Sequence, residues 1–415
     1  MDDFESSVRL VCGMNDFKPQ TLRSDTQYKR IYYLDWLRVM AFGLLFLFHS
    51  WRPFDHMEWH LKNAEQSTFF DVLTIFAHGW RMYLIFFVSG AGTWLALRSR
   101  KRAFLRDRVK RLLVPYLFGI LIIIPPQRFY EWIQFQGFEG SYLEFLTLYP
   151  AWQLGNTMGT SLLLWFGHLG THLWFLPFLF VMTLISLPLL RRIQQGKVDL
   201  AWLQYIMDRK FGVFALILPL FLFRLLLKPV FSAYTDWADF LIYLCPFLYG
   251  FVFMQHPGLL EIIKKRTWLL LNAGVVSSIT FLYLVAQGDH IMLAYLFPSY
   301  SLLHLGLSVL AATISVSWVL FFVGLFARTL DFNHRLLVPA NISILPIYVL
   351  HQTLIIVFGY YIVILPMNLY LKFLLVVFTA LPASLLLYHV IRTNNLIRFL
   401  FGLKRLSRSP KENTV

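Results

Sequence analysis

Long apolar stretches recur along this chain, and they permit few folds because a lipid bilayer offers no water to satisfy backbone polar groups. Of the 415 residues, 58% are hydrophobic and 14% are charged, and the mean hydropathy is +0.60. Soluble domains contain far more charge and less apolar surface. Because helices satisfy their own backbone groups in lipid, the sequence predicts an all-α, polytopic membrane helical bundle.

About ten stretches approach the roughly 20 residues that cross a bilayer as a helix. They lie at residues 34–51, 79–97, 112–126, 172–190, 211–228, 239–255, 268–287, 300–326, 339–362 and 367–391. Basic clusters recur between them, and an even number of crossings puts all the clusters on one side. They are Lys29 and Arg30; the run from Arg98 to Arg111; Arg191, Arg192 and Lys197; Lys264, Lys265 and Arg266; and Lys404, Arg405 and Arg408. The positive-inside rule places this side and both termini in the cytoplasm.

The chain divides into three segments by composition. Residues 1–27 are expected to form a flexible cytoplasmic tail, residues 28–396 a transmembrane domain, and residues 397–415 a basic cytoplasmic tail. The first segment lacks the apolar core of a cleavable signal peptide, so we expect the first helix to direct membrane insertion.

The charge and cysteine content exclude several function classes. The net charge of +15 comes from short basic clusters between apolar stretches, which is the topogenic pattern rather than that of a nucleic-acid-binding surface. Cys12 and Cys245 form neither a disulfide framework nor a metal-ligand spacing. We expect no nucleic-acid partner, no metal and no permanently bound cofactor. The oligomeric state stays open, since lipid-facing and partner-facing surfaces look alike.

The first apolar stretch carries three ionisable residues, Asp35, Arg38 and His49, and such residues are costly inside a membrane. Arg38 and His49 are 11 residues apart. This spacing is close to three helical turns, so both side chains lie on one stripe of a helix about 16 Å apart. Asp35 shares the stripe. The pattern indicates a polar cavity that runs through much of the membrane.

The second apolar stretch adds His78 and Arg81, which are expected to share a helix face near its outer end. Ser89 opens a run of small residues that ends at Gly92. Such a run lets a second helix, or a ligand, approach the backbone closely.

The basic run from Arg98 to Arg111 follows this stretch. It is explained equally well by membrane topology, by anionic lipid headgroups, or by the phosphates of a cytoplasmic ligand. For the last of these, Arg106, Arg108 and Arg111 are the candidates, since guanidinium groups bind phosphate well.

His172 and His351 lie in later apolar stretches. A lone membrane histidine is often a packing residue bonded to a neighbouring helix, whereas several from separate helices indicate a shared polar cavity. His49 and His172 both lie near the outer ends of their stretches. A bundle that joins them would gather imidazoles suited to general-base work on an alcohol.

Taken in order, the motifs resemble the acyltransferase-3 family of integral membrane O-acyltransferases. The resemblance rests on Arg38 and His49 with ten residues between them, FFVSG at 86–90, RLLVPY at 111–116, THLWF at 171–175 and IYVLH at 347–351. It extends from Tyr33 to about Arg392. The resemblance implies a succinyl or acetyl group, an acyl-CoA donor on the cytoplasmic side, and as acceptor a hydroxyl of an extracytoplasmic carbohydrate such as a periplasmic glucan. It also implies a multi-pass protein of a bacterial-type inner membrane.

The resemblance suggests roles for the residues singled out above. His49 is expected to deprotonate the acceptor hydroxyl or to take the acyl group transiently, and Arg38 to engage the charged part of the donor or to polarise the site. Arg81 would bind the distal carboxylate of a succinyl group. The remaining candidates for holding substrate or orienting His49 are Asp35, His78, Ser89, His172, Trp174 and His351, and those for donor phosphates are Arg106, Arg108 and Arg111.

Two other function classes compete with this interpretation. A secondary transporter or flippase for a glycolipid or organic anion would also need intramembrane Arg and His, but not a cytoplasmic CoA site. A structural scaffold would leave the ionisable residues without a purpose. The sequence contains none of the phosphate-binding or nucleophile-elbow motifs of soluble enzymes.

Overall fold

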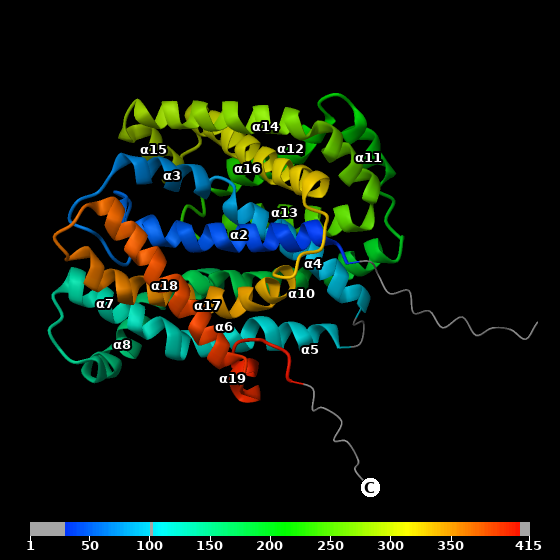
Figure 1. Ribbon diagram of the computed structural model, residues 1–415. Helices are drawn as coiled ribbons and strands as arrows, with labels where there is room; N and C mark the ends of the chain where they lie inside the picture. Colours follow the sequence, from blue (N-terminus) through cyan, green and yellow to red (C-terminus); the bar gives the residue numbers. More distant parts are fainter. Residues whose placement is uncertain (1–29, 100–102, 407–415) are drawn as a thin grey trace, which may run out of the picture. The chain divides into compact units, whose positions relative to one another are not determined.

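The computed structural model describes residues 30–99 and 103–406, and within these ranges every regular element is a helix (Figure 1). The described helices belong to one compact unit that begins at Tyr32. The expected N-terminal tail, residues 1–27, lies outside the described part. So do residues 407–415 of the expected C-terminal tail. In chain order the elements are α2 (Tyr32–Trp51), η1 (Arg52–Phe54), α3 (Thr68–His78), α4 (Arg81–Ser99), α5 (Phe104–Arg108), η2 (Val109–Leu113), α6 (Val114–Phe118), η3 (Gly119–Ile123), α7 (Ile124–Gln136), α8 (Tyr142–Thr157), α9 (Leu162–Gly170), η4 (Thr171–Trp174), α10 (Phe175–Gln194), α11 (Ala201–Asp208), η5 (Gly212–Leu216), α12 (Ile217–Leu227), α13 (Trp237–Gln255), α14 (Pro257–Ala286), α15 (Asp289–Leu296), α16 (Leu302–Thr329), α17 (Leu337–Val363), α18 (Leu369–Ile391) and α19 (Asn395–Leu400).

The all-α membrane architecture is confirmed, with 8 helices in the described residues long and apolar enough to cross a bilayer. They are Thr68–Ser99, Phe104–Gln136, Leu162–Gln194, Trp237–Gln255, Pro257–Ala286, Leu302–Thr329, Leu337–Val363 and Leu369–Ile391. Two of the expected crossings fall outside this group. The helix Gly212–Leu227 is shorter, and α2 carries Asp35, Arg38 and His49, which lower its hydropathy.

The third expected crossing, at residues 112–126, is part of a much longer helical segment, Phe104–Gln136. Two turns of this segment, Val109–Leu113 and Gly119–Ile123, are π-helical. Pro115 and Pro125 follow these turns. Because proline cannot donate an intrahelical hydrogen bond, a locally widened turn lets the helix continue through it.

The expectation that His78 and Arg81 share a helix face is wrong. His78 ends α3 and Arg81 begins α4, with a turn at Gly79 and Trp80 between them. The regular helix is therefore interrupted between two residues that the 3.6-residue period would place one above the other, although both line the same cavity.

Helices α4 and α13 pack with their backbones in direct contact through two glycines. A Cβ atom at Gly90 would overlap the carbonyl of Phe247, and one at Gly250 would overlap the carbonyl of Phe87. The small-residue run around Ser89 therefore serves helix packing, as in other close membrane crossings.

Helix α2 lies at the centre of the bundle in Figure 1 and contacts α4, α16 and α17. Two contacts show that α2 and α4 run in opposite directions. Arg81 at the start of α4 lies over the ring of Phe48 near the end of α2, whereas Gly92 near the end of α4 meets Arg38 near the start of α2. Arg81 and Gly92 are 11 residues apart, and Arg38 and Phe48 are 10 residues apart. The two contacts therefore define two levels of the bundle, about 16 Å apart along α4.

Candidate functional site

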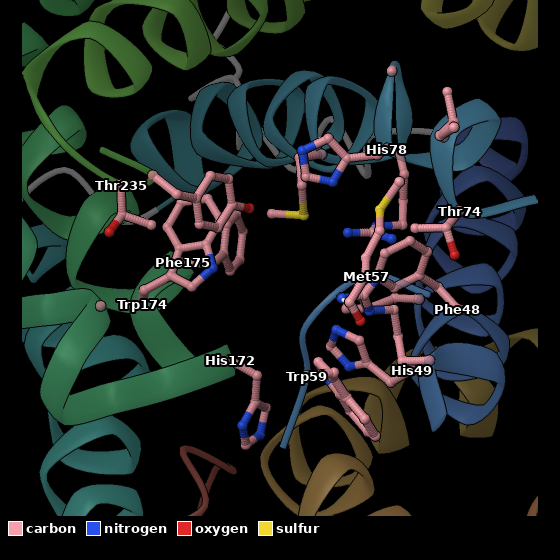
Figure 2. Close-up of a pocket in the computed structure, with 18 of the residues that line it drawn as sticks. Phe48, His49, Met57, Trp59, Thr74, His78, His172, Trp174, Phe175 and Thr235 are labelled. Carbon is pink, nitrogen blue, oxygen red and sulfur yellow. Dashed lines mark hydrogen bonds between the residues drawn. The ribbon is translucent and has the colours of Figure 1, made fainter. Parts of the chain in front are cut away.

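A cavity of about 750 Å³ opens at the level that holds His49 and Arg81. In Figure 2, His49, Met57 and Trp59 lie along one wall and Trp174 and Phe175 along the facing wall, with open space between them. The lining of the cavity is mostly apolar, which is typical of a small-molecule site. The polar and aromatic side chains that line it include His49, Arg52, Trp59, His60, His78, Arg81, Arg128, His168, His172, Trp174, Tyr234, Tyr295, Tyr348 and Gln352.

Three histidines from α2, η4 and α17 meet at this cavity. His49 Nδ1 lies 2.8 Å from His351 Nε2, and the two rings are nearly parallel, at 9°, with their centroids 5.0 Å apart. The His172 ring lies 5.2 Å from that of His351 and 6.5 Å from that of His49. His49 and His172 line the cavity. His351 is 1% exposed and lies behind His49, outside the set of described lining residues.

Backbone carbonyl groups hold the two later histidines. His351 Nδ1 lies 2.6 Å from the carbonyl oxygen of Tyr348, and His172 Nε2 lies 3.3 Å from that of Val349. The hydroxyl of Tyr348 in turn donates a hydrogen bond to the carbonyl of His172. These bonds fix the orientation of both rings.

A buried amide network next to His172 was not foreseen from the sequence. Gln127 Nε2 donates a hydrogen bond of 2.7 Å to the Thr353 hydroxyl, and Gln127 Oε1 accepts one of 3.1 Å from Gln352. Thr171 Oγ1 lies 3.2 Å from His172 Nδ1. Gln127 lies at the end of an apolar run, and single buried amides of this kind carry no sequence motif.

Arg81 is 3% exposed and lines the cavity with its guanidinium 3.3 Å from the centroid of the Phe48 ring. Its Nε and Nη1 atoms are buried without a hydrogen-bond partner, and no ion pair joins Arg81 to any described carboxylate. Cation–π contact with Phe48 compensates only part of the cost of burying this charge. The cavity therefore presents an uncompensated cation.

The carboxylates near this cavity already have cationic partners. Asp55 is fully buried and accepts bonds from Arg52 Nη1 at 2.6 Å and from Lys62 Nζ at 2.5 Å. Glu131 pairs with Arg128 at 2.8 Å and with His60 at 2.8 Å. Burial lowers the pKa of Arg52 and of Lys62, and their pairing with Asp55 opposes this. These bonds fix the segment between η1 and α3 against the mouth of the cavity.

Arg38 and Asp35 lie at the other level and are not among the residues that line the cavity. Arg38 Nη1 lies 3.4 Å from Asp35 Oδ1, and the Arg38 side chain is 28% exposed. A Cβ at Gly92 would come within 2.5 Å of Arg38 Nη2. The cavity at His49 therefore does not extend along the stripe of α2 as far as Arg38 and Asp35.

Arg108 joins Arg38 at this second level. Its Nη2 donates a hydrogen bond of 2.6 Å to the hydroxyl of Thr93, next to Gly92. Arg106 and Arg111 are exposed on the same helical segment. Of the three guanidinium groups expected to bind phosphate, that of Arg108 therefore lies at the level of Arg38, about 16 Å along α4 from Arg81.

Two further candidates differ in their surroundings. Trp174 lines the cavity and contacts the rings of Tyr234 and Tyr243. Ser89 is outside the lining and donates its hydroxyl hydrogen to the carbonyl of Ile85 within α4. Among the residues that the structure describes, no group of three or more His, Cys, Asp or Glu side chains is arranged to hold a metal ion.

Comparison with known proteins adds a family match to this geometry. A family model described as an acyltransferase domain matches residues 31–389. Glucans biosynthesis protein C of Escherichia coli strain SMS-3-5 is 30% identical over 169 residues, and that of strain HS is 29% identical over the same length. Each match covers 40% of this chain and 41% of the relative, so the chain aligns with less than half the length of these proteins. No solved structure matches this chain significantly.

Proposed function

This chain belongs to the acyltransferase-3 family and is a membrane-bound O-acyltransferase, and we propose that it moves a succinyl or acetyl group from acyl-CoA to a hydroxyl of an extracytoplasmic carbohydrate. The observation that carries the proposal is His49, a buried imidazole whose ring borders a cavity of about 750 Å³. A periplasmic glucan is our candidate acceptor, since the partial match to glucans biosynthesis protein C favours it.

The proposed orientation follows from the basic residues. Helix α4 runs from the cavity at Arg81 to the basic run that begins at Arg98. The positive-inside rule assigns the Arg98 end to the cytoplasm and the cavity to the outer half of the membrane. Counting α2 and Gly212–Leu227 as crossings gives the even number that puts both termini in the cytoplasm of a bacterial-type inner membrane.

In the proposed reaction, the phosphates of acyl-CoA bind at the cytoplasmic level, where Arg38 and Arg108 lie beside Gly92 and Thr93. Guanidinium groups suit this task because they bind phosphate oxygens in a bidentate manner. Arg106 and Arg111 would add charge at the cytoplasmic surface. The acyl arm would then extend between the helices towards the cavity.

At the cavity, His49 takes the proton of the acceptor hydroxyl while the hydroxyl oxygen attacks the thioester carbon. The carbon–sulfur bond breaks, and the departing thiolate receives the proton from His49 to leave as a thiol. In the second route His49 attacks first and an acyl-histidine forms before the hydroxyl accepts the group. Both routes need an unprotonated His49 nitrogen that faces the cavity.

The acceptor would lie between aromatic side chains. Trp59 and Trp174 line facing walls of the cavity (Figure 2), and Tyr234 adjoins Trp174 with ring centroids 5.5 Å apart. Aromatic faces offer apolar area together with polar edges, which suits the alternating apolar and hydroxylated faces of a sugar. His78 would hold one of its hydroxyl groups, and the ring of His172, which also borders the cavity, would pack against the sugar.

The test is acyl transfer by the purified protein in proteoliposomes, with radiolabelled acetyl-CoA or succinyl-CoA supplied on one side and periplasmic glucan on the other. We expect label in the glucan with the wild type and its loss in His49→Ala and Arg38→Ala. His304→Phe is the matched control, because His304 is a buried membrane histidine outside the cavity. Transport of a glycolipid or organic anion without any acyl transfer would instead support a transporter.

A further inference from the structure

We propose that His351 is a positioning residue that fixes the tautomer of His49 and so leaves the Nε2 atom of His49 unprotonated and facing the cavity. The inference rests on the proposed function and adds the atom at which the chemistry occurs. It follows from a chain of hydrogen bonds that begins at a backbone carbonyl.

The direction of each hydrogen bond follows from the one before it. The carbonyl of Tyr348 can only accept, so His351 Nδ1, 2.6 Å away, carries a hydrogen and donates it. A neutral imidazole has one N–H, so His351 Nε2 is an acceptor. His49 Nδ1, 2.8 Å from that atom, must then donate. This leaves His49 Nε2 with a lone pair.

That lone pair is available to substrate. No described residue forms a hydrogen bond with His49 Nε2, and His49 borders the cavity. His351 is buried behind it, with the rings of Phe46 and Tyr348 at 6.2 Å and 5.8 Å. His351 therefore touches His49 but not the cavity, and it acts on the reaction only through His49.

His172 is a poorer candidate for the base, although it also borders the cavity. Its Nε2 atom lies 3.3 Å from the carbonyl of Val349 and is therefore the donor. Its Nδ1 atom accepts from the Thr171 hydroxyl at 3.2 Å. Because both nitrogens are occupied, His172 would have to break a bond before it could take a proton.

The pair performs the orienting task that a carboxylate performs in a Ser-His-Asp triad, with a neutral group in its place. When His49 Nε2 takes the proton of the attacking hydroxyl, His49 becomes an imidazolium and its bond to His351 becomes charge-assisted. The proton then passes from Nε2 to the departing thiolate. A neutral orienting partner avoids a permanent buried anion, which would be costly inside a membrane.

Three variants of His351, with Phe, Gln or Glu in its place, separate this role from simple packing. His351→Phe keeps a planar ring but removes the acceptor, and we expect kcat to fall about 100- to 1000-fold, less than the roughly 10⁴-fold loss when a triad loses its orienting carboxylate. The KM for acyl-CoA should change less than about twofold, since His351 does not border the cavity. His351→Gln, whose amide oxygen can accept from His49, should recover at least about tenfold of that loss.

The pH dependence and NMR give readouts that packing would not move. His351→Glu places a carboxylate beside His49 Nδ1, which favours the imidazolium, so the acidic limb of the kcat profile should shift to higher pH. ¹⁵N NMR of histidine-labelled wild type should show His49 with Nδ1 protonated and Nε2 bare, and His351→Phe should show a mixture. His304→Phe should match the wild type in both measurements.

The inference is overturned if His351→Phe retains kcat within about threefold, or if His49 in the wild type carries its hydrogen on Nε2. It is also overturned if folded His351→Gln is no more active than His351→Phe. The proposed function fails separately, if the wild type transfers no acyl group from any CoA donor. The NMR measurement needs no activity, so it tests the tautomer in either case.

Discussion

Arg38 on α2 and Arg108 on α5 converge on one turn of α4, where Arg38 lies against Gly92 and Arg108 donates a hydrogen bond of 2.6 Å to Thr93. Arg38 also pairs with Asp35 at 3.4 Å, and Arg108 adds a second guanidinium group of the kind that binds phosphate oxygens. The two arginines thus support a binding level for an anionic donor, apart from the cavity at His49.

Gly92→Ala should displace the Arg38 guanidinium without unfolding the protein. The new methyl group would come within 2.5 Å of Arg38 Nη2, which is the flexible end of a side chain and can move away. We expect the KM for acyl-CoA to rise about tenfold, since small misplacements of a binding group have effects of this size or larger. Gly43→Ala, which has open space around it, is the control. Unchanged KM in both variants would remove Arg38 from the donor site.

Gly90→Ala should destabilise the bundle instead. The carbonyl of Phe247 occupies the space that the new Cβ needs, and a helix backbone cannot move as a side chain does. We expect a loss of about 1–3 kcal/mol, typical of overpacking, measured as a lower midpoint of thermal unfolding in detergent. A midpoint equal to that of Gly43→Ala would show that α4 and α13 do not pack as closely as described.

Arg81→Gln should discriminate between acyl donors. Succinyl-CoA and butyryl-CoA carry acyl chains of the same carbon count, and only the former ends in a carboxylate that can pair with Arg81. We expect kcat/KM to fall about 10- to 100-fold for succinyl-CoA, the usual worth of a hydrogen bond to a charged group, and less than about threefold for butyryl-CoA. Equal effects on both donors, or none on either, would show that Arg81 does not select a carboxylate.

The His60→Gln variant should lose less stability than the wild type when the pH falls. Burial lowers the pKa of His60 below its ordinary value of 6.5, although Glu131 opposes this. Between the two values the unfolded chain binds more protons than the folded one, so stability falls as pH drops below about 6.5. The unfolding midpoint of His60→Gln should therefore fall less than that of the wild type between pH 7.5 and 5.5. If the unfolding midpoints of the two proteins fall equally over this pH range, His60 has the same pKa in the folded and the unfolded chain.

Much of the fold could be predicted because lipid makes hydropathy decisive. The stretches at 239–255 and 339–362 fall within α13 and α17 and end within one residue of them. The period of a helix could not reveal the turn at Gly79, which separates His78 from Arg81. Nor could it show that residues 104–136 form one span through two π-helical turns.

The sequence could predict which types of residue form the site, but not the role of each residue within it. Histidines in separate apolar stretches indicated a common place, and the structure puts His49, His172 and His351 there. The roles within that group depend on which backbone carbonyl each ring meets, and a sequence does not state this. Arg38 was expected in the same cavity because a helical stripe shows which residues share a face of α2, but not how far a cavity beside that face extends.

The close contact of α4 with α13 has a consequence for the size of the donor. Gly90 and Gly250 hold α4 in place between the Arg81 level and the Gly92 level, so about 16 Å of helix separates the two. A donor whose charged end is held at Gly92 must carry its reactive carbon on a slender arm of that length. A compact acyl phosphate would span only one level, whatever its reactivity. In the proposed mode of binding, the length of α4 between the two levels would therefore select donors by the length of the arm that carries the acyl group.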